Sequence, residues 1–534
     1  MLTPLLRKAA QVASDPVLRR WLLARATGRE TSPPAFTPGA PPYLTGLARW
    51  TGAAPLPQTP LKPLNAAKPT QPIDIKLPGA TVRLTPGDPD ALFARRYADL
   101  ETELAAYRFA WVPVMGSAAD PAWVDATWRA FHRRFATPDS GWAWHAYTAA
   151  ERAINILDFA HVHGVPGERD DTIAFLARHA AVIAGRLEYF GEHYTSNHLS
   201  NDARGLFLIG LALGLYRWAD LGGRMLLAEA ARIFRPSGIL REGSSHYHAL
   251  LTRNYASAWR AARSAGRPEA DELEAIVRRA AACLPLLTLP GGFSLIGDVS
   301  PDCSPDFVLN DLAPLIAYAP PATADALAAD GWLRADFGPW SGLWHAEPDG
   351  WCPMPGHGHQ DMGGFELHHR GTPLFRDLGR GTYHHAADAA ATAHNGMTID
   401  NRDPYPQNRP YYTAAFRRAA GGAPPVLTRT ANTVELRGPV NRIWSFDGDS
   451  LTIHDRIDGT GRHRVARRLH TALPVSQVGY TVRVADFTIE SDVAPSLKPV
   501  TLWTAYGVGV PASAIVFETM TTLPYQADIR VRHG

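Results

Sequence analysis

The spacing of apolar residues divides the chain into a helical part and a strand-rich part. From about Asp90 to Asp330, apolar residues recur three and four positions apart, as in Ile173, Leu176, Ala180 and Ile183. This spacing predicts amphipathic helices that bury one face. Further segments of this kind are 121–135, 148–161, 205–216, 224–234, 249–265 and 270–284. Short loops with Gly, Pro or Asp separate them, so we expect antiparallel helix pairs in a curved or closed array.

After Pro339 the apolar residues alternate with polar ones. The alternating segments are Val434–Arg437, Leu451–Ile457, Val482–Val484 and Phe487–Ile489. Alternation bounded by Gly-Asp, Asp-Gly and Pro turns is typical of antiparallel strands with one buried face. The pattern therefore predicts a multidomain α+β protein. It has a helical domain at residues 76–340 and an antiparallel β-sandwich at 341–534.

Residues 1–75 form a third region. An N-terminal helical pattern is followed by a proline-rich segment at 32–72, which cannot be a helix interior and is predicted to wrap a core in an extended form. The N-terminus lacks the uninterrupted apolar run and cleavage site of a secretory signal. The apolar stretch Gly205–Tyr216 is too short to span a bilayer. We expect a cytoplasmic protein without a transmembrane segment. The alternative is peripheral membrane contact through an amphipathic helix at Leu2–Leu23.

Composition excludes some classes of protein. With 534 residues, two or more domains are expected. A net charge of +2 argues against a nucleic-acid partner bound by a broad basic face. Cys283, Cys303 and Cys352 have no CxxC spacing, so they imply no disulfide framework.

A histidine-rich stretch marks a candidate site. Seven of the 21 histidines lie between His357 and His394. Imidazole and carboxylate ligands suit zinc, so His359, Asp377 and His394 could bind one ion and leave His357 free for proton transfer. The alternative for any one histidine is a surface or hydrogen-bonded core residue. Segments 363–367 and 374–378, with a turn at 371–373, predict a hairpin that carries Asp377 back past His357–Asp361.

Two loops before predicted helices carry further candidates. The first is Thr195–Asn201, where helix capping explains Asn201 better than Asn197. The second is Arg241–His248, where Tyr247 is either an acid/base tyrosine or an aromatic residue packed at a helix start. In Trp142–Tyr147, the indole of Trp144 could stack on a sugar ring or fill the core.

Several motifs together resemble those of the heparinase II/III and related alginate lyase group of polysaccharide lyases. The resemblance spans about Trp142 to Asp400. Its motifs are TSNHLSNDARGLFLIG, the E-x-S-x-x-Y-H of 242–248, the GD of 297–298, the H-x-H-x-D of 357–361, a hairpin ending in RDLG, and AHNGMTID. The resemblance implies an N-terminal incomplete (α/α) toroid followed by a C-terminal antiparallel β-sandwich. It also implies cleavage of an acidic, uronate-containing glycan by β-elimination.

The resemblance implies roles for individual residues. Asn197 would neutralise the uronate carboxylate. Tyr247 would protonate the glycosidic oxygen, and also abstract the C5 proton when both lie on one face. His357 would act as a base or help to neutralise charge, with His198 assisting. A structural zinc ion (Zn2+) would be held by His359, Asp377 and His394.

The substrate would be an acidic polysaccharide or oligosaccharide. The predicted substrate-binding residues are His198, Arg204, Arg241, Glu242, Trp144 and Arg380. Arg402 is a further candidate, since a guanidinium suits carboxylates and sulfates, although a surface or structural role is the more common one for each arginine. Without a signal peptide, the substrate is expected to be an exopolysaccharide that the cell makes. The oligomeric state is left open, with a dimer as one option.

Two alternatives to a lyase are considered. One is a glycan-binding or exopolysaccharide-biosynthesis accessory protein on the same fold. The other is a glycoside hydrolase, which needs two acidic residues across the bond, whereas Glu242 is the only well-placed acid.

Overall fold

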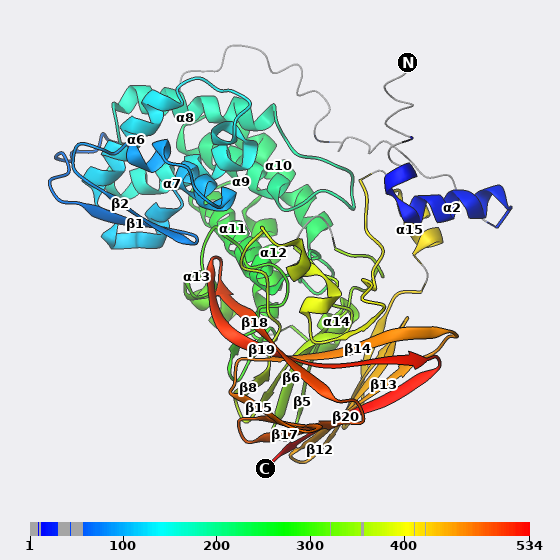
Figure 1. The fold of residues 1–534 in the computed structure, drawn as a ribbon. Helices are drawn as coiled ribbons and strands as arrows, with labels where there is room; N and C mark the ends of the chain where they lie inside the picture. The colour runs from blue at the N-terminus through cyan, green and yellow to red at the C-terminus, as the bar shows by residue number, and fades with distance from the viewer. Residues whose placement is uncertain are drawn as a thin grey trace.

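The structure is a computed structural model. It describes residues 12–29, 57–320, 322–353, 357–410, 412–421 and 423–534, together with Ala9 and Tyr43. A helical part lies against a strand-rich C-terminal part (Figure 1). The predicted mixed α+β class is therefore confirmed. Within the described ranges, no helix has the length and apolar character that crossing a membrane requires.

Helices of the first part occupy most of the predicted segments, but the predicted segment 205–216 is divided between two helices. Their bounds are α3 Ala91–Ala94, α4 Leu100–Arg108, α5 Trp111–Met115, α6 Pro121–Arg134, α7 Ala146–His163, α8 Arg169–Ala184, α9 His198–Ala212, α10 Tyr216–Ile233, α11 Ser245–Ser264, α12 Ala270–Cys283 and α13 Pro305–Tyr318. Helices adjacent in sequence pack on each other, as α7 does on α8, α9 on α10 and α11 on α12. The approach of α9 and α10 requires Gly222, because a Cβ there would lie 2.5 Å from the backbone nitrogen of Phe207.

The N-terminal region differs from the prediction in two ways. The helical domain begins with a β-hairpin, β1 (Ile73–Leu77) and β2 (Ala80–Leu84), at a place where no strand was predicted. Helix α2 (Pro16–Ala26), capped by Asp15, packs its buried residues against α15 (Ala414–Ala420) (Figure 1). Val17, Leu18 and Trp21 of this helix are thus covered by the protein itself. Most of the first half of the predicted Leu2–Leu23 helix lies outside the described residues, so the membrane-contact alternative stays a prediction. Most of the proline-rich segment lies outside the described residues.

The second part is built from antiparallel sheets. One sheet has the order β5-β6-β7-β8, a second the order β10-β11-β12-β13-β20-β17-β16-β15, and a third the order β18-β19-β14-β9. The strand bounds are β5 Trp332–Phe337, β6 Trp340–His345, β7 Gly364–His369, β8 Thr372–Phe375, β9 Met397–Ile399, β10 Val426–Arg429, β11 Thr433–Arg437, β12 Asn441–Asp447, β13 Ser450–Ile457, β14 Arg462–Thr471, β15 Val475–Val478, β16 Thr481–Val484, β17 Phe487–Ser491, β18 Pro495–Ala505, β19 Val508–Thr522 and β20 Tyr525–His533. Residues of all three sheets share one hydrophobic core. The predicted domain boundary lies at residue 340. Strand β5 begins earlier, directly after the short helix α14 (Ala324–Ala329).

The predicted hairpin is present as β7 and β8. Arg370 and Gly371 join the two strands with φ angles of 48° and 83°. Two successive residues with positive φ are the mark of the tight turn that matches the twist of paired strands. The hairpin places Asp377 directly after β8, close to the histidine-rich loop.

A buried ion pair crosslinks β12 and β13, and it gives a stability prediction. Arg442 donates to both carboxylate oxygens of Asp455 at 2.5 and 3.0 Å, and both side chains are nearly inaccessible. Asp455→Ala would leave the guanidinium buried without its partner, so we expect a loss of about 3–5 kcal/mol in unfolding free energy. Chemical denaturation measures it. As a control, Asp458→Ala removes an exposed partner of Arg456 and should change stability by less than about 0.5 kcal/mol.

Candidate active site

Three segments far apart in the sequence meet where the helical part faces the β part. They are the start of α9, the start of α11 and the loop between β6 and β7. Ser244 caps α11 by accepting from the backbone N–H of Tyr247 at 3.1 Å, and its own hydroxyl donates to the Asp298 carbonyl. The Asp298 N–H in turn donates to the carbonyl of His357 at 3.0 Å. The backbone thus fixes Tyr247 and His357 relative to Asp298.

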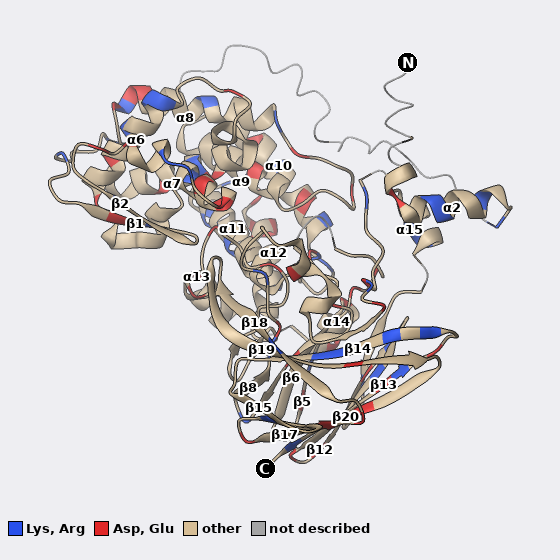
Figure 2. Cartoon of the chain, in the orientation of Figure 1, with Lys and Arg blue, Asp and Glu red and all other residues tan. Residues whose placement is uncertain are grey.

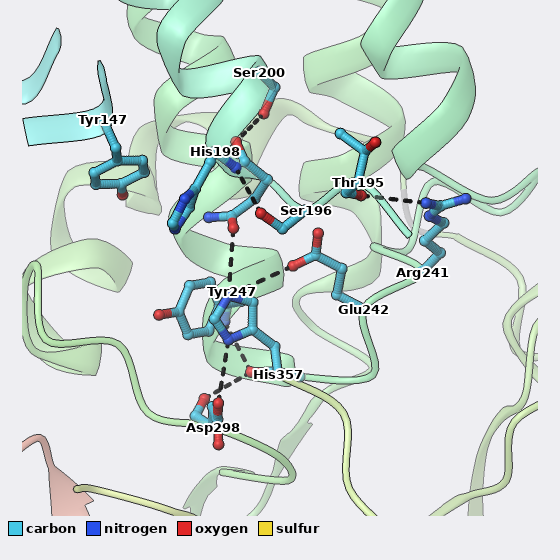
Figure 3. A network of polar contacts seen from close by, with 12 residues as sticks. Tyr147, Thr195, Ser196, His198, Ser200, Arg241, Glu242, Tyr247, Asp298 and His357 are labelled. Atoms are coloured by element: carbon cyan, nitrogen blue, oxygen red, sulfur yellow. Dashed lines mark hydrogen bonds and ion pairs between the residues drawn. The ribbon is translucent and has the colours of Figure 1, made fainter. Parts of the chain in front are cut away.

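The structure brings together the three predicted catalytic residues, Asn197, Tyr247 and His357. His357 Nε2 lies 3.3 Å from Asn197 Oδ1, and its ring stacks on that of Tyr247 with centroids 3.6 Å apart (Figure 3). All three side chains are buried. Asn197 occupies the N-cap position of α9, yet its side chain makes no capping hydrogen bond. The amide is therefore available to the site. Asn201, which was predicted to cap a helix, lies inside α9, and its side chain accepts a hydrogen bond from Arg204 instead.

The electrostatics favour a charged His357. Burial acts to lower the pKa of His357, but the hydrogen bond to Asp298 (Nδ1 to Oδ2, 3.2 Å) and the charge of Glu242 outweigh it and raise the pKa. Glu242 Oε2 lies 3.8 Å from His357 Nε2, and burial raises the pKa of this carboxyl. Hydrogen bonds from His357 and His359 outweigh burial at Asp298 and lower its pKa.

Two residues of the site had no role in the sequence prediction. The Tyr383 hydroxyl lies 2.7 Å from the Tyr247 hydroxyl. Burial raises the pKa of both phenols well above the usual value. Asp298 belongs to the GD motif, but its contacts to His357 and His359 are visible only in the structure. Tyr383 lies in a Gly-rich loop with no pattern that marks it; only its place within the histidine-rich stretch could have drawn attention.

Two predicted substrate-binding residues lie away from the site. Trp144 is fully buried, its indole N–H donates to the Phe135 carbonyl, and the Arg152 guanidinium lies over its ring. It fills the core and offers no face to a sugar. Arg204 is buried against Glu151, because α9 directs it into the helical core. For both residues the structural alternative is the correct one.

The other predicted binding residues lie nearer the site. His198 is partly exposed, 2.7 Å from Glu188, and its ring lies beside that of Tyr147 (Figure 3). Arg241 donates to the backbone carbonyl of Glu192 at 2.8 Å. Arg380 stacks over the Tyr383 ring and lies 3.5 Å from Asp298. Arg402 is exposed on the β part.

The predicted zinc ligands lie near one another without forming a metal site. The rings of His359 and His394 have centroids 4.9 Å apart, and each leaves one buried ring nitrogen without a hydrogen bond. Asp377, however, accepts from the His394 ring at 2.8 Å and from the Gly379 N–H at 3.0 Å. Among the described residues, no group of three or more His, Cys, Asp or Glu side chains is arranged to hold a metal ion. The zinc ion therefore stays a prediction, and no step below depends on one.

Comparison with known proteins relates this site to a family. The family described as "Heparinase II/III-like, C-terminal" matches residues 320–492. A solved structure of heparinase III is similar with a TM-score of 0.58 and 14% identity, covering 81% of this chain and 75% of that one. A heparan sulfate lyase from Pedobacter heparinus gives a TM-score of 0.51 and 17% identity, covering 83% and 78%. A search of curated proteins finds no match.

These likenesses span both parts of the chain. The match to a second heparinase III structure covers 97% of this chain and 91% of that one, with a TM-score of 0.55 and 14% identity. At such identities the solved structures establish the fold alone. Residues 320–492, which make up most of the β part, match the heparinase II/III-like C-terminal family.

Proposed function

We propose that the protein is a polysaccharide lyase that cleaves a uronate-containing glycan by β-elimination. One observation carries the proposal: Asn197, Tyr247 and His357 come from three distant segments and converge within hydrogen-bond or stacking distance. The family of the β part and the fold shared with heparinase III agree with it. The same likeness supports an incomplete (α/α) toroid for the helical part.

The first requirement of the reaction is neutralisation of the uronate carboxylate. The C5 proton becomes acidic only when hydrogen-bond donors stabilise the charge that moves onto the carboxylate as the proton leaves. An imidazolium at His357 and the amide of Asn197 are two such donors, fixed side by side. The raised pKa of His357 favours this role over that of a general base. Asp298 holds the imidazolium in place through Nδ1.

The second requirement is proton transfer from C5 to the glycosidic oxygen. Both phenols stay protonated at neutral pH because burial raises their pKa, and their hydroxyls are 2.7 Å apart. Tyr247 must therefore lose its hydroxyl proton before it can act as a base, and a hydrogen bond from Tyr383 stabilises the phenolate that results. The Tyr247 phenolate takes the C5 proton as the C5–H bond breaks and gives it to the glycosidic oxygen as the C4–O bond breaks. The electrons of the C5–H bond become the C4=C5 double bond.

The hydrolase alternative finds less support in the geometry. Its two acids would have to be Glu242 and Asp298, which flank the same imidazole. The oxygens of Asp298 are occupied by His357 and His359 and approached by Arg380. Burial raises the pKa of Glu242, as a general acid requires. Asp298, with both oxygens engaged by these side chains, is however not free to activate a water molecule or to attack the sugar.

The cytoplasmic location, the exopolysaccharide substrate and the structural zinc ion stay predictions.

The proposal is tested by incubating the purified protein with heparan-, chondroitin-, hyaluronan- and alginate-type polymers. We expect ultraviolet absorbance of a conjugated C4–C5 unsaturated uronate to grow with at least one of them. The polymer that responds names the substrate class. Chain shortening without that absorbance would contradict elimination.

A further inference from the structure

A trough on the β part offers a second place for an anionic sugar. It is a cavity of about 740 Å3, within the range usual for ligand pockets. Its floor is one face of the sheet β18-β19-β14, and its wall is formed by residues of segment 378–393. We call this cavity the β trough.

Strand alternation explains why the floor is cationic. Arg464, Arg468 and His470 of β14 are two or four residues apart, so their side chains lie on one face. Val465 and Leu469 between them point into the hydrophobic core. Figure 2 shows the blue of Lys and Arg along β14. One face of this sheet thus closes the core and the other presents charge.

The cross-strand register adds a lysine to this face. Ala514 of β19 pairs with His470 on one side and with Lys498 of β18 on the other. Lys498 and His470 therefore flank Ala514 on the same face. Lys498 is exposed, and among the described residues it has no ion pair.

Two buried groups on the floor are not fully paired. Arg468 is 7% exposed, and within the described ranges it donates only to neutral oxygens, Thr398 Oγ1 at 2.8 Å and Asn401 Oδ1 at 3.3 Å. His470 is 1% exposed, and no described residue forms a hydrogen bond with its Nδ1. Two carboxylates line the trough, Glu518, which lies 3.6 Å from Arg464, and Asp388. The floor thus keeps two cations, Arg468 and Lys498, without a carboxylate partner in the described part of the chain.

The wall of the β trough also belongs to the candidate active site. Leu378, Gly379 and Thr382 line the trough, whereas Arg380 and Tyr383 of the same segment contact Asp298 and Tyr247. The Leu378 carbonyl accepts from the Trp503 N–H at 2.9 Å, which ties the wall to β18. The trough and the site are therefore on two sides of one short segment.

We propose that the β trough binds an anionic pyranose, carboxylated or sulfated, of the same glycan that is cleaved at Tyr247. The guanidinium of Arg468 and the ammonium of Lys498 suit the anion, and the apolar surface of Trp503 and Val516 suits the C–H face of the ring. This proposal rests on the proposed function for the identity of the glycan. The trough would then favour long substrates over short ones.

The test compares Lys498→Gln with Arg483→Gln, which removes an exposed cation from the other large sheet. Substrates are short and long oligosaccharides of the polymer that responds in the absorbance assay. For Lys498→Gln we expect KM for the long substrate to rise roughly threefold to tenfold, with kcat and the short substrate unchanged. Arg483→Gln should change nothing. Arg468→Gln should act in the same direction, provided that its melting temperature matches the wild type.

Measurements of glycan binding distinguish a failure of this proposal from a failure of the proposed function. Calorimetry measures binding of each polymer to Tyr247→Phe, with and without Lys498→Gln. If no polymer is cleaved but Lys498→Gln weakens polymer binding, the lyase proposal fails and the trough stands. If cleavage occurs and Lys498→Gln leaves affinity for long substrates unchanged, the trough proposal is overturned. Binding of inorganic sulfate to the trough without an effect on the glycan would overturn it equally.

Discussion

Tyr247→Phe is expected to lower kcat by about 100- to 10,000-fold, the range for loss of a general acid. The ring and its stacking on His357 stay, and only the hydroxyl that faces Tyr383 is lost. Substrate affinity should therefore hardly change. Initial rates of ultraviolet absorbance give kcat, and calorimetry gives the affinity.

The control for this variant lies on the same helix. Tyr255 is also buried in α11, and its hydroxyl donates to the Leu226 carbonyl at 3.0 Å, away from the site. Tyr255→Phe should lower stability by about 1 kcal/mol and leave kcat unchanged. Equal losses of kcat in both variants would mean that the effect comes from packing of α11. That result would contradict an acid role for Tyr247. Full activity of Tyr247→Phe would contradict that role directly.

Asn197→Ala is expected to lower kcat by about 100- to 1,000-fold, as for loss of one donor to a developing negative charge. Its amide makes no capping hydrogen bond to α9, so the helix should keep its stability. Asn197→Asp should be worse, because its carboxylate would repel that of the substrate. Rates and thermal unfolding of both variants check this.

A matched asparagine tests whether the loss is specific. Asn155 is buried in α7, and its amide donates to the Arg108 carbonyl at 2.9 Å, outside the site. Asn155→Ala should reduce stability and leave kcat unaltered. If Asn197→Ala instead lowers the melting temperature and retains its rate, Asn197 is structural and carboxylate neutralisation must be assigned elsewhere.

The local elements of this fold could be predicted because they follow from short-range patterns. The helical spacing of residues 173–183 gives α8, and the alternation of 451–457 gives β13. The hairpin β7–β8 could be predicted from its Gly-containing turn. The hairpin β1–β2 was missed because five-residue strands next to a proline-rich segment give little periodic signal.

In the candidate site, only the residues that lie in recognisable motifs could be predicted. Asn197, Tyr247 and His357 lie in recognisable motifs, and the fold brings them together. The pairing of Tyr383 with Tyr247 depends on how a Gly-rich loop of the β part packs against α11, which no local pattern specifies. Trp144 was misassigned because burial depends on neighbours distant in sequence. The β trough likewise depends on the pairing of β14 with β19.

The most direct test of the account is the mass balance of the products in water enriched in heavy oxygen. Elimination breaks the C4–O bond without adding water, so the masses of the two products should sum to that of the substrate, and neither should carry the label before the reducing-end oxygen exchanges with water. Mass spectrometry of a cleaved oligosaccharide reads this in one experiment. Products that together exceed the substrate by one labelled water would show hydrolysis and contradict the assignment of a lyase.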